Sequence, residues 1–258
     1  MVLARRLAAR TLLARSLVAR RLTAGALLAA TGAAGLAAGA TPVAAAPSGS
    51  GTRASALYKD ALATTHSWSV HYASNSTESK QTLVESGDAG PASGSQTVLM
   101  GKGSISILVI GGISYVKGNV PGLQSLAGLS ASQAAEATGQ WIEFSTDNSA
   151  FAPVVSGVRS QDVAEELALK APLSLGPGRK LDGNAVDAID GTQTFGRKSQ
   201  PVVLYVRAHG SHFPVEEDSV NAKGQSTAAE HITYSKWGEK VRPEAPMATV
   251  SVGPISAV

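Results

Sequence analysis

One stretch, residues 96–119, constrains the fold more than any other part of the chain. Within it, serine alternates with isoleucine over residues 104–107, which is the period of a β-strand that buries one face. Gly111-Gly112 then provides the backbone freedom of a tight hairpin turn, and the strand-forming residues 113–117 follow. We therefore predict one long strand, a turn and a return strand, with an apolar face that something must cover.

The first 46 residues are typical of an export signal. They contain six arginines and no acidic residue, and an Ala-, Leu- and Gly-rich run leads to Val43-Ala44-Ala45-Ala46. A basic, then apolar, then small-residue order predicts cleavage after Ala45 or Ala46 and secretion of the remainder. The alternative, a retained membrane anchor, is disfavoured because the apolar run is only weakly hydrophobic. Arg20-Arg21 leaves the choice between the Sec and twin-arginine routes open.

Net charge and cysteine content exclude several classes of function. Removing six of the 22 basic residues leaves 16 against 19 acidic ones, a formal charge of −3, which gives no support to nucleic-acid binding. The sequence has no cysteine, which excludes disulfides, thiolate metal sites, a cysteine nucleophile and a lipid-modified N-terminal cysteine. We expect a flexible tether at 47–52, a single domain at 53–250 and a tail at 251–258.

The remaining pattern places one block of helices between two groups of strands. A helix is predicted at 53–64, and the block contains helices that begin near Ser130 and Ser160 and an apolar helix at 151–158. This order indicates an α+β fold: a curved antiparallel β-sheet, or half-barrel, with short helices packed over its concave face. The predicted strands are 67–73, 79–87, the two arms of 96–119, 140–144, 179–189, 193–195, 202–208 and 230–235.

The connections between these elements also carry signals. Residues 88–94 contain two glycines and a proline and predict a turn, and Asp190-Gly191 predicts a hairpin turn. The Pro-rich segment 237–246 is unsuited to a helix, so we predict an edge strand or a segment lashed along the sheet.

A surplus of apolar residues marks the candidate site. Ile105, Ile107 and Val109 on one strand are predicted to share a face with Ile113 and Tyr115 on the next. Aromatic residues make up only 5% of the chain, and the covering helices are short and rich in Ala, Gly and Ser, so we predict a cavity under a cover that shifts at little cost. An acyl chain would suit such a cavity, whereas an ordinary packed core is the alternative. The covering block contributes Leu123, Leu126, Leu129, Phe144, Phe151, Val154, Val155 and Val158.

The sequence carries no strong signal for catalysis or for a metal. His209 and His212 lie near an acidic run at 216–218, but a solvated turn is the preferred explanation over a metal site. Ser211 beside His212 lacks a nucleophile-elbow motif, and adjacent strand residues point apart. Glu165-Glu166 and the run at 216–218 are predicted to be solvated surface. We therefore predict a protein that is not an enzyme and uses no cofactor and no metal.

Several short motifs follow one another in a characteristic order. The Gly-punctuated hairpin ends in Ile113–Gly118, Leu204-Tyr205-Val206 leads to Phe213-Pro214-Val215, and Ser235-Lys236-Trp237-Gly238 precedes the Pro-rich end. With the export signal, and with Trp141-Ile142 after the helical block, the chain resembles the LppX/LprG family of actinobacterial envelope lipid-binding proteins, within the wider LolA-like carriers. The resemblance covers most of residues 52–246.

The resemblance implies a half-barrel with helices in its mouth and an apolar cavity that shields the acyl chains of lipids or lipoglycans as they cross the envelope. Many family members carry a lipid-modified cysteine where this chain has Ala45-Ala46-Pro47, so this protein is expected to be released rather than tethered. We expect a monomer that binds a lipid or other apolar small molecule, contacts the membrane at most transiently and binds no nucleic acid. The alternative is an envelope interaction or sensor module of the same fold that binds a protein partner.

Overall fold

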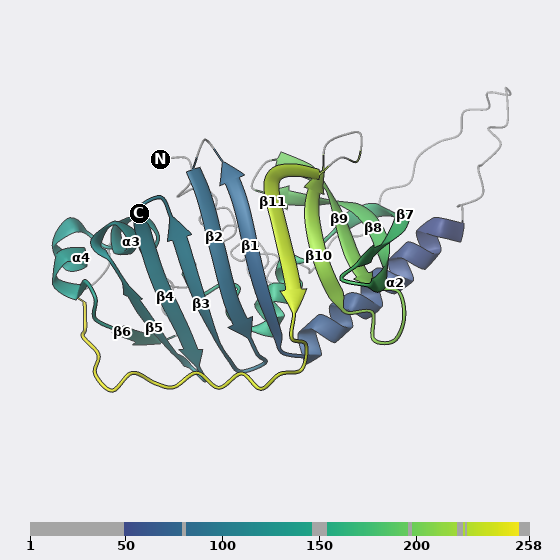
Figure 1. Ribbon diagram of the computed structural model, residues 1–258. Helices are drawn as coiled ribbons and strands as arrows, with labels where there is room; N and C mark the ends of the chain where they lie inside the picture. Colours follow the sequence, from purple (N-terminus) through teal and green to yellow (C-terminus); the bar gives the residue numbers. More distant parts are fainter. Residues whose placement is uncertain are drawn as a thin grey trace, which may run out of the picture.

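The structure is a computed structural model that describes residues 49–78, 81–145, 154–195, 198–220, 224 and 226–252. These residues form an 11-stranded antiparallel sheet that is curved and not closed, with a few mostly short helices (Figure 1). The predicted fold class, α+β with a half-barrel sheet, is confirmed. The elements are α2 (Gly49–Ser67), β1 (Val70–Glu78), β2 (Gln81–Ala89), β3 (Ser93–Met100), β4 (Gly103–Ile110), β5 (Ile113–Gly118), α3 (Val120–Ser125), α4 (Ala131–Ala137), β6 (Ile142–Ser145), α5 (Ser160–Glu166), β7 (Lys170–Leu181), β8 (Asn184–Phe195), β9 (Lys198–Arg207), β10 (Pro214–Val220) and β11 (Ser226–Ser235).

The strands form two meanders that meet in the middle of the sheet. β1 to β6 step outward one after another to one edge, and β7 to β11 step inward from the opposite edge, so that β11 pairs with β1. The segment that contains α5 carries the chain from one edge to the other. Each half is therefore built from local hairpins, and the β1–β11 ladder joins the two halves.

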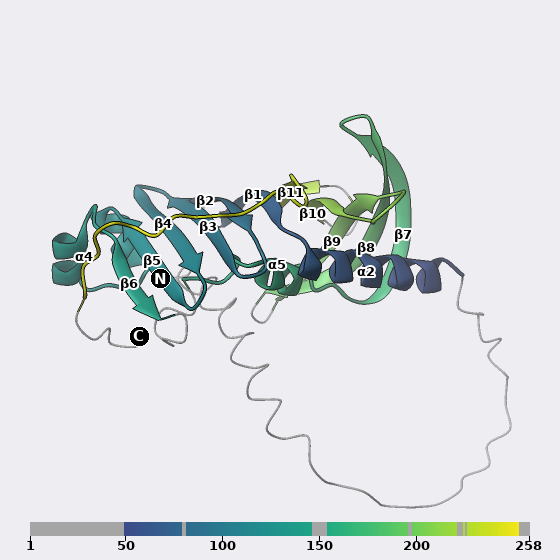
Figure 2. The same cartoon turned by 90° about the horizontal axis from the view of Figure 1, so that it is seen from below.

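The register decides which residues share a face, because opposed residues on neighbouring antiparallel strands point to the same side. Tyr72 opposes Gly87, Gly87 opposes Gln96, Gln96 opposes Ile107, and Ile107 opposes Val116. We call this side the inner face; α2 and α5 lie over it (Figure 2). The other side is the outer face.

Two apolar clusters occupy the inner face. The α3 cluster lies toward the β6 edge and consists of Leu83, Val98, Ile105, Ile107, Val109, Val116, Leu123, Leu126, Ala127, Leu129, Ala134, Ala137, Ile142, Phe144, Val154, Val155 and Val158. The α2 cluster joins α2 and α5 to β1, β8, β9 and β11 and consists of Ala54, Leu57, Ala61, Val70, Tyr72, Ala89, Val163, Leu167, Leu169, Ile189, Val202, Leu204, Val206, Ile232 and Tyr234.

The hairpin predicted within residues 96–119 is partly confirmed. Ile110 pairs with Ile113 across Gly111-Gly112, and Gly111 has a φ of 61°, so this turn is confirmed. The predicted long first arm is wrong, because a second turn at Gly101-Lys102 divides it into β3 and β4. The predicted turn at 88–94 is also too long, since β2 extends to Ala89 and β3 begins at Ser93.

The predicted hairpin turn at Asp190-Gly191 is wrong. These residues lie inside β8, where Asp190 pairs with Val203 of β9, and the turn between β7 and β8 is Asp182-Gly183 instead. A side chain at Gly191 would approach the Cδ2 atom of Leu173 to 2.9 Å. This glycine therefore makes room for a leucine on the neighbouring strand rather than for a turn.

Two predicted helices also differ from the structure. α2 begins at Gly49, inside the segment predicted as a flexible tether, and ends at Ser67. Of the apolar helix predicted at 151–158, residues 154–158 form turns and bends, and residues 151–153 lie outside the described residues. Tertiary contacts hold this segment, because a Cβ atom at Gly94 would lie 1.9 Å from the carbonyl oxygen of Val158.

The segment after β11 is lashed along the sheet, as predicted. Gly238 N donates to Ser69 O at 2.9 Å, and Val250 N donates to Trp141 O at 2.8 Å. Val250 also forms a parallel bridge with Ile142 of the edge strand β6. In Figure 1 this yellow segment follows the lower ends of the strands and then rises beside β6. It therefore partly covers an edge that could otherwise pair with another chain.

Candidate functional site

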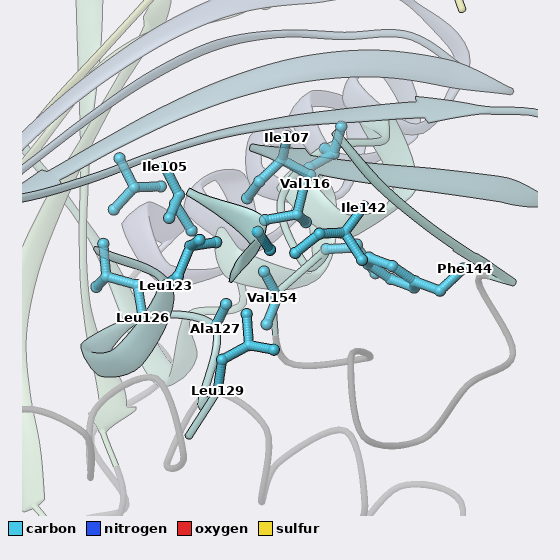
Figure 3. Close-up of a cluster of buried hydrophobic side chains, with 14 of the residues drawn as sticks. Ile105, Ile107, Val116, Leu123, Leu126, Ala127, Leu129, Ile142, Phe144 and Val154 are labelled. Carbon is cyan, nitrogen blue, oxygen red and sulfur yellow. The ribbon is translucent and has the colours of Figure 1, made fainter. Parts of the chain in front are cut away.

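The α3 cluster is held over the sheet by a short capped helix. Asn119 caps α3, since its Oδ1 atom accepts hydrogen bonds from Gly122 N at 2.8 Å and Ser104 N at 3.1 Å. Its Nδ2 atom donates to Lys102 O at 2.8 Å, so one side chain ties the helix to the β3–β4 turn. Gly122 then lies directly against β4, which brings Leu123 of α3 over Ile105 (Figure 3).

Helix α4 contributes little to the same cluster. It begins with a capping box, in which Ser130 Oγ accepts from Gln133 N and Ser130 N donates to the Gln133 side chain. Ala134 and Ala137 are its buried residues. Because two methyl groups bury little area, lifting α4 costs about 2 kcal/mol of apolar burial. The cover of the α3 cluster is therefore in short pieces, one of them weakly held.

Most of the predicted site residues come together here. Ile105, Ile107 and Val109 of β4 are buried in the α3 cluster with Leu123, Leu126, Leu129, Phe144, Val154, Val155 and Val158 from the covering segments. Figure 3 shows the labelled side chains of β4 and β5 directed toward those of α3 and the segment that follows it. Phe151 lies outside the described residues.

Two predicted site residues lie on the wrong face. Tyr115 opposes Leu108 and Ile113 opposes Ile110, so both point to the outer face. Val116 and Ile142 take the inner positions instead and are fully buried. The Gly-Gly turn has two residues, and this length fixes the register; counting back from it would have placed Val116 opposite Ile107 from sequence alone.

A band of buried polar residues separates the two apolar clusters on the inner face. Ser74 opposes Glu85, and Ser76 opposes Glu230, so the four side chains are neighbours where β2, β1 and β11 meet. All four are at most 5% exposed. Sequence reasoning missed this band, although serines that follow Val70 and Tyr72 at every second residue of β1 were its signal.

Three serine hydroxyls on the inner face, those of Ser74, Ser114 and Ser219, have no protein partner in the described part of the chain. Ser114 Oγ lies beside the α3 cluster, opposite Val109 and Phe144, and Ser74 Oγ lies in the polar band. All three serines are buried. Such hydroxyls are rare in filled cores, because a buried donor without an acceptor costs free energy.

The α2 cluster is covered differently, by a long helix with specific anchors. The hydroxyl of Tyr58 donates to Leu167 O at 3.0 Å and accepts from Leu169 N at 2.6 Å. Burial raises the pKa of Tyr58, against the opposing effect of the Leu169 hydrogen bond. Gln193 Nε2 further links Glu166 O at 3.1 Å to Glu217 Oε1 at 2.9 Å. This half of the inner face is therefore fastened by side-chain hydrogen bonds.

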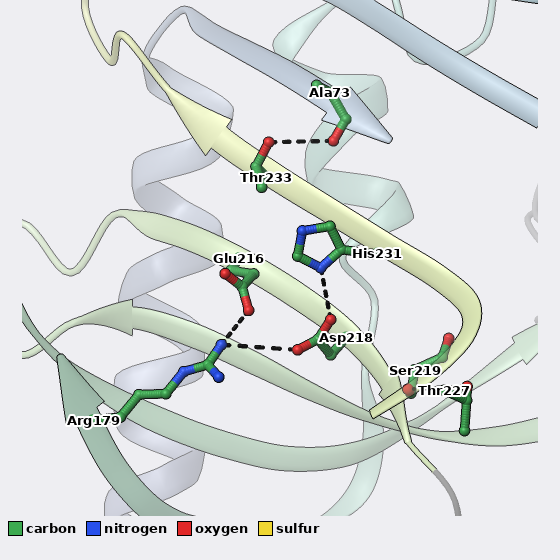
Figure 4. A network of polar contacts seen from close by, with 8 residues as sticks. All are labelled: Ala73, Arg179, Glu216, Asp218, Ser219, Thr227, His231 and Thr233. Carbon is green, nitrogen blue, oxygen red and sulfur yellow. Dashed lines mark hydrogen bonds and ion pairs between the residues drawn. The ribbon is translucent and has the colours of Figure 1, made fainter. Parts of the chain in front are cut away.

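The acidic run at 216–218 is not the solvated surface that the sequence predicted. It belongs to β10, and Glu217 and Asp218 are 3% and 5% exposed. On the outer face, Arg179 pairs with Glu216 and lies 3.8 Å from Asp218, while His231 Nδ1 lies 2.7 Å from Asp218 Oδ1 (Figure 4). Burial raises the pKa of Glu216 although Arg179 opposes the shift.

Donor atoms of Glu216, Asp218 and His231 lie within 4.8 Å of one another. Arg179 already forms ion pairs with these carboxylates and His231 hydrogen-bonds to Asp218, so the group is best explained as a clasp between β7 and β10 rather than as a metal site. His209 and His212, the histidines that the sequence analysis considered, do not belong to it.

Comparisons with known proteins find similarity in fold. No family model and no curated protein sequence matches the chain. The fold is similar to that of LprF from Mycobacterium bovis, at 14% identity and a TM-score of 0.49, covering 76% of this chain and 97% of that one. Lipoprotein LppX from Mycobacterium tuberculosis is similar at 17% identity and a TM-score of 0.45, covering 74% and 98%. A LolA superfamily protein from Nitrosomonas europaea follows at 13% identity and a TM-score of 0.29, covering 74% and 94%.

The structures found thus include LppX and a LolA superfamily protein, the groups that the sequence motifs resemble.

Among the described residues, none of the helices combines the length and the apolar character that a membrane span requires.

Proposed function

We propose that the protein is a non-enzymatic, exported carrier that holds the acyl part of a lipid, or another apolar small molecule, at the α3 cluster. The observation that carries this proposal is the pair of buried hydroxyls of Ser114 and Ser74, which lack a partner in the described part of the chain. A filled core would leave few such groups. A face that receives a ligand with some polar atoms accounts for them.

The cover of the α3 cluster supports the proposal. α3 and α4 have six and seven residues, and α4 buries two alanines, so opening this cover disrupts little packing. The α2 cluster, fastened through Tyr58, would remain as the fixed half of the fold. An acyl chain that enters the α3 cluster gains about 0.8 kcal/mol for each methylene that it buries. A chain of ordinary length would therefore offset the cost of lifting α4.

The polar band suggests how the other end of the ligand is accommodated. Glu85 and Glu230 are carboxylates on the same face as the acyl site, next to the hydroxyls of Ser74 and Ser76. Carboxylates accept hydrogen bonds and repel anions. The band therefore suits a hydroxyl-rich head group, such as that of a lipoglycan, better than an anionic one.

The test is a titration of delipidated protein with a fluorescent palmitoyl analogue. We expect saturable uptake, and we expect Ser114→Ala to weaken it by about two- to tenfold through the loss of one hydrogen bond. The same substitution should raise the thermal midpoint of the empty protein, because it removes a buried, unsatisfied hydroxyl. Ser106→Ala, on the outer face of β4, is the matched control.

A lack of saturable uptake would contradict the carrier proposal. If uptake fails and a protein co-purifies at fixed stoichiometry, the interaction-module alternative stands in its place. Normal uptake by Ser114→Ala with unchanged stability would show that this hydroxyl is not at the site.

A further inference from the structure

Three aromatic rings gather at one end of the sheet, outside the site described above. Trp68 lies between α2 and β1, Phe213 precedes β10, and Trp237 follows β11. The ring centroids of Trp68 and Phe213 are 5.8 Å apart with their planes at 83°, and those of Phe213 and Trp237 are 4.9 Å apart at 22°. Trp68 is nevertheless 48% exposed.

The exposed ring is held in place. A Cβ atom at position 238 would lie 2.8 Å from the Trp68 ring, so Gly238 packs directly against it. Gly238 N donates to Ser69 O, and Trp237 Nε1 donates to Pro214 O, both at 2.9 Å. The Trp68 ring is therefore fixed by its neighbours although half of it is exposed.

The aromatic group continues into the interior. Trp237 packs against the α2 cluster, stacks on Phe213, and through it reaches Trp68 at the surface. An apolar path therefore runs from the inner face to this end of the sheet.

Three basic side chains lie on the same C-terminal segment as Trp237. A cavity of about 260 Å³ between the C-terminal segment and β1–β3 is lined by Lys236, Lys240 and Arg242. These side chains take part in no hydrogen bond or ion pair within the described residues and are exposed. The acids that also line the cavity are Asp88, which is paired with a histidine, and Glu239. Three cations therefore line this cavity together with two acids.

We propose that these six residues (Trp68, Phe213, Trp237, Lys236, Lys240 and Arg242) form a docking edge for an anionic membrane surface. Tryptophan and lysine or arginine together are the composition of a membrane interface, where rings enter the head-group layer and cations meet anionic lipids. This inference rests on the proposed function, since a carrier must meet the membranes between which it moves its lipid. The apolar path through Trp237 places that meeting point next to the interior.

The experiment measures partitioning of the host-processed protein to vesicles of phosphatidylcholine alone and of phosphatidylcholine with one-third phosphatidylglycerol. We expect binding to the anionic vesicles that weakens as salt rises. Trp68→Ser should weaken it at least threefold, and the triple variant Lys236→Gln, Lys240→Gln, Arg242→Gln at least tenfold. The matched controls are Leu99→Ser, of similar exposure, and Lys102→Gln, which should bind like the unchanged protein.

All variants have the same N-terminus, so any difference in vesicle binding between them comes from the substituted residues. Equal binding by the edge variants and the controls would overturn the proposal, as would equal binding to neutral and anionic vesicles. Uptake of the palmitoyl analogue in free solution is measured in parallel and should be unchanged by the edge substitutions. If the edge variants lose vesicle binding but take up the analogue normally, the docking-edge proposal is supported. If the protein does not take up the analogue but its vesicle binding still depends on the edge residues, only the carrier proposal is refuted. Far-ultraviolet circular dichroism checks that each variant is folded.

Discussion

The backbone of helix α3 approaches the sheet closely at Gly122, and this contact gives a specific prediction. A Cβ atom there would lie 2.2 Å from the carbonyl oxygen of Ser104 and 2.7 Å from its carbonyl carbon and nitrogen. An ordinary contact begins near 3.4 Å, so α3 and β4 must separate by roughly 1 Å to accept one methyl group. The obstacle is backbone on a paired strand, which cannot turn aside as a side chain could.

Gly122→Ala should therefore lift α3 and loosen the packing of Leu123 and Leu126, which are 0% and 4% exposed. Overpacking of this kind costs about 1–3 kcal/mol, which lowers the thermal midpoint of a domain of this size by about 4–8 °C at a central value of about 2 kcal/mol. The assay is thermal unfolding followed by circular dichroism, with the denaturant midpoint as an independent measure.

Gly112→Ala is the matched control. A Cβ atom at Gly112 meets nothing within 4 Å, and the backbone there is outside the left-handed region that favours glycine. It should change the midpoint by less than about 1 °C. If Gly122→Ala unfolds at the same temperature as Gly112→Ala, α3 does not rest on β4 in the way described, and the account of the cover fails.

Two further predictions concern the fixed half of the fold and the outer face. Tyr58→Phe removes the hydroxyl that joins Leu167 O to Leu169 N, so chemical denaturation should show a loss of about 1–3 kcal/mol; an unchanged denaturant midpoint would argue against the anchor. Burial raises the pKa of Asp190 above its ordinary value of 3.8, so ionisation of this carboxyl opposes folding. Asp190→Asn should therefore unfold at a higher temperature than the unchanged protein at pH 7, with the difference vanishing as the pH falls below 3.8. A difference that persists in acid would mean that the cause is not the charge.

The sequence predicted the general architecture because local periodicity is a strong, short-range feature. The Gly111-Gly112 hairpin and the apolar positions of β4 follow from spacing alone. Two Asp-Gly pairs, at 182–183 and 190–191, carry the same turn chemistry, and only the pairing of β8 with β9 decides that the first is the turn. Turn residues identify candidates, whereas partner strands select among them.

The site was predicted less completely, for reasons of register and of tertiary burial. Tyr115 was assigned to the inner face because it is apolar and near Ile113, but a two-residue turn places Val116 there. The acidic run in β10 was taken for surface because charged residues are seldom buried alone. Pairing with Arg179, His231 and Gln193, all distant in sequence, makes burial of its members possible, and single-sequence patterns do not reveal such partners.

The most direct test of the carrier proposal is native mass spectrometry of the protein purified from its own host, followed by solvent extraction. The account predicts a discrete additional mass, in about one copy per chain, that leaves the protein on extraction and is recovered as a lipid. Recovery of the bare polypeptide mass, with no lipid in the extract and no uptake of the palmitoyl analogue afterwards, would contradict it.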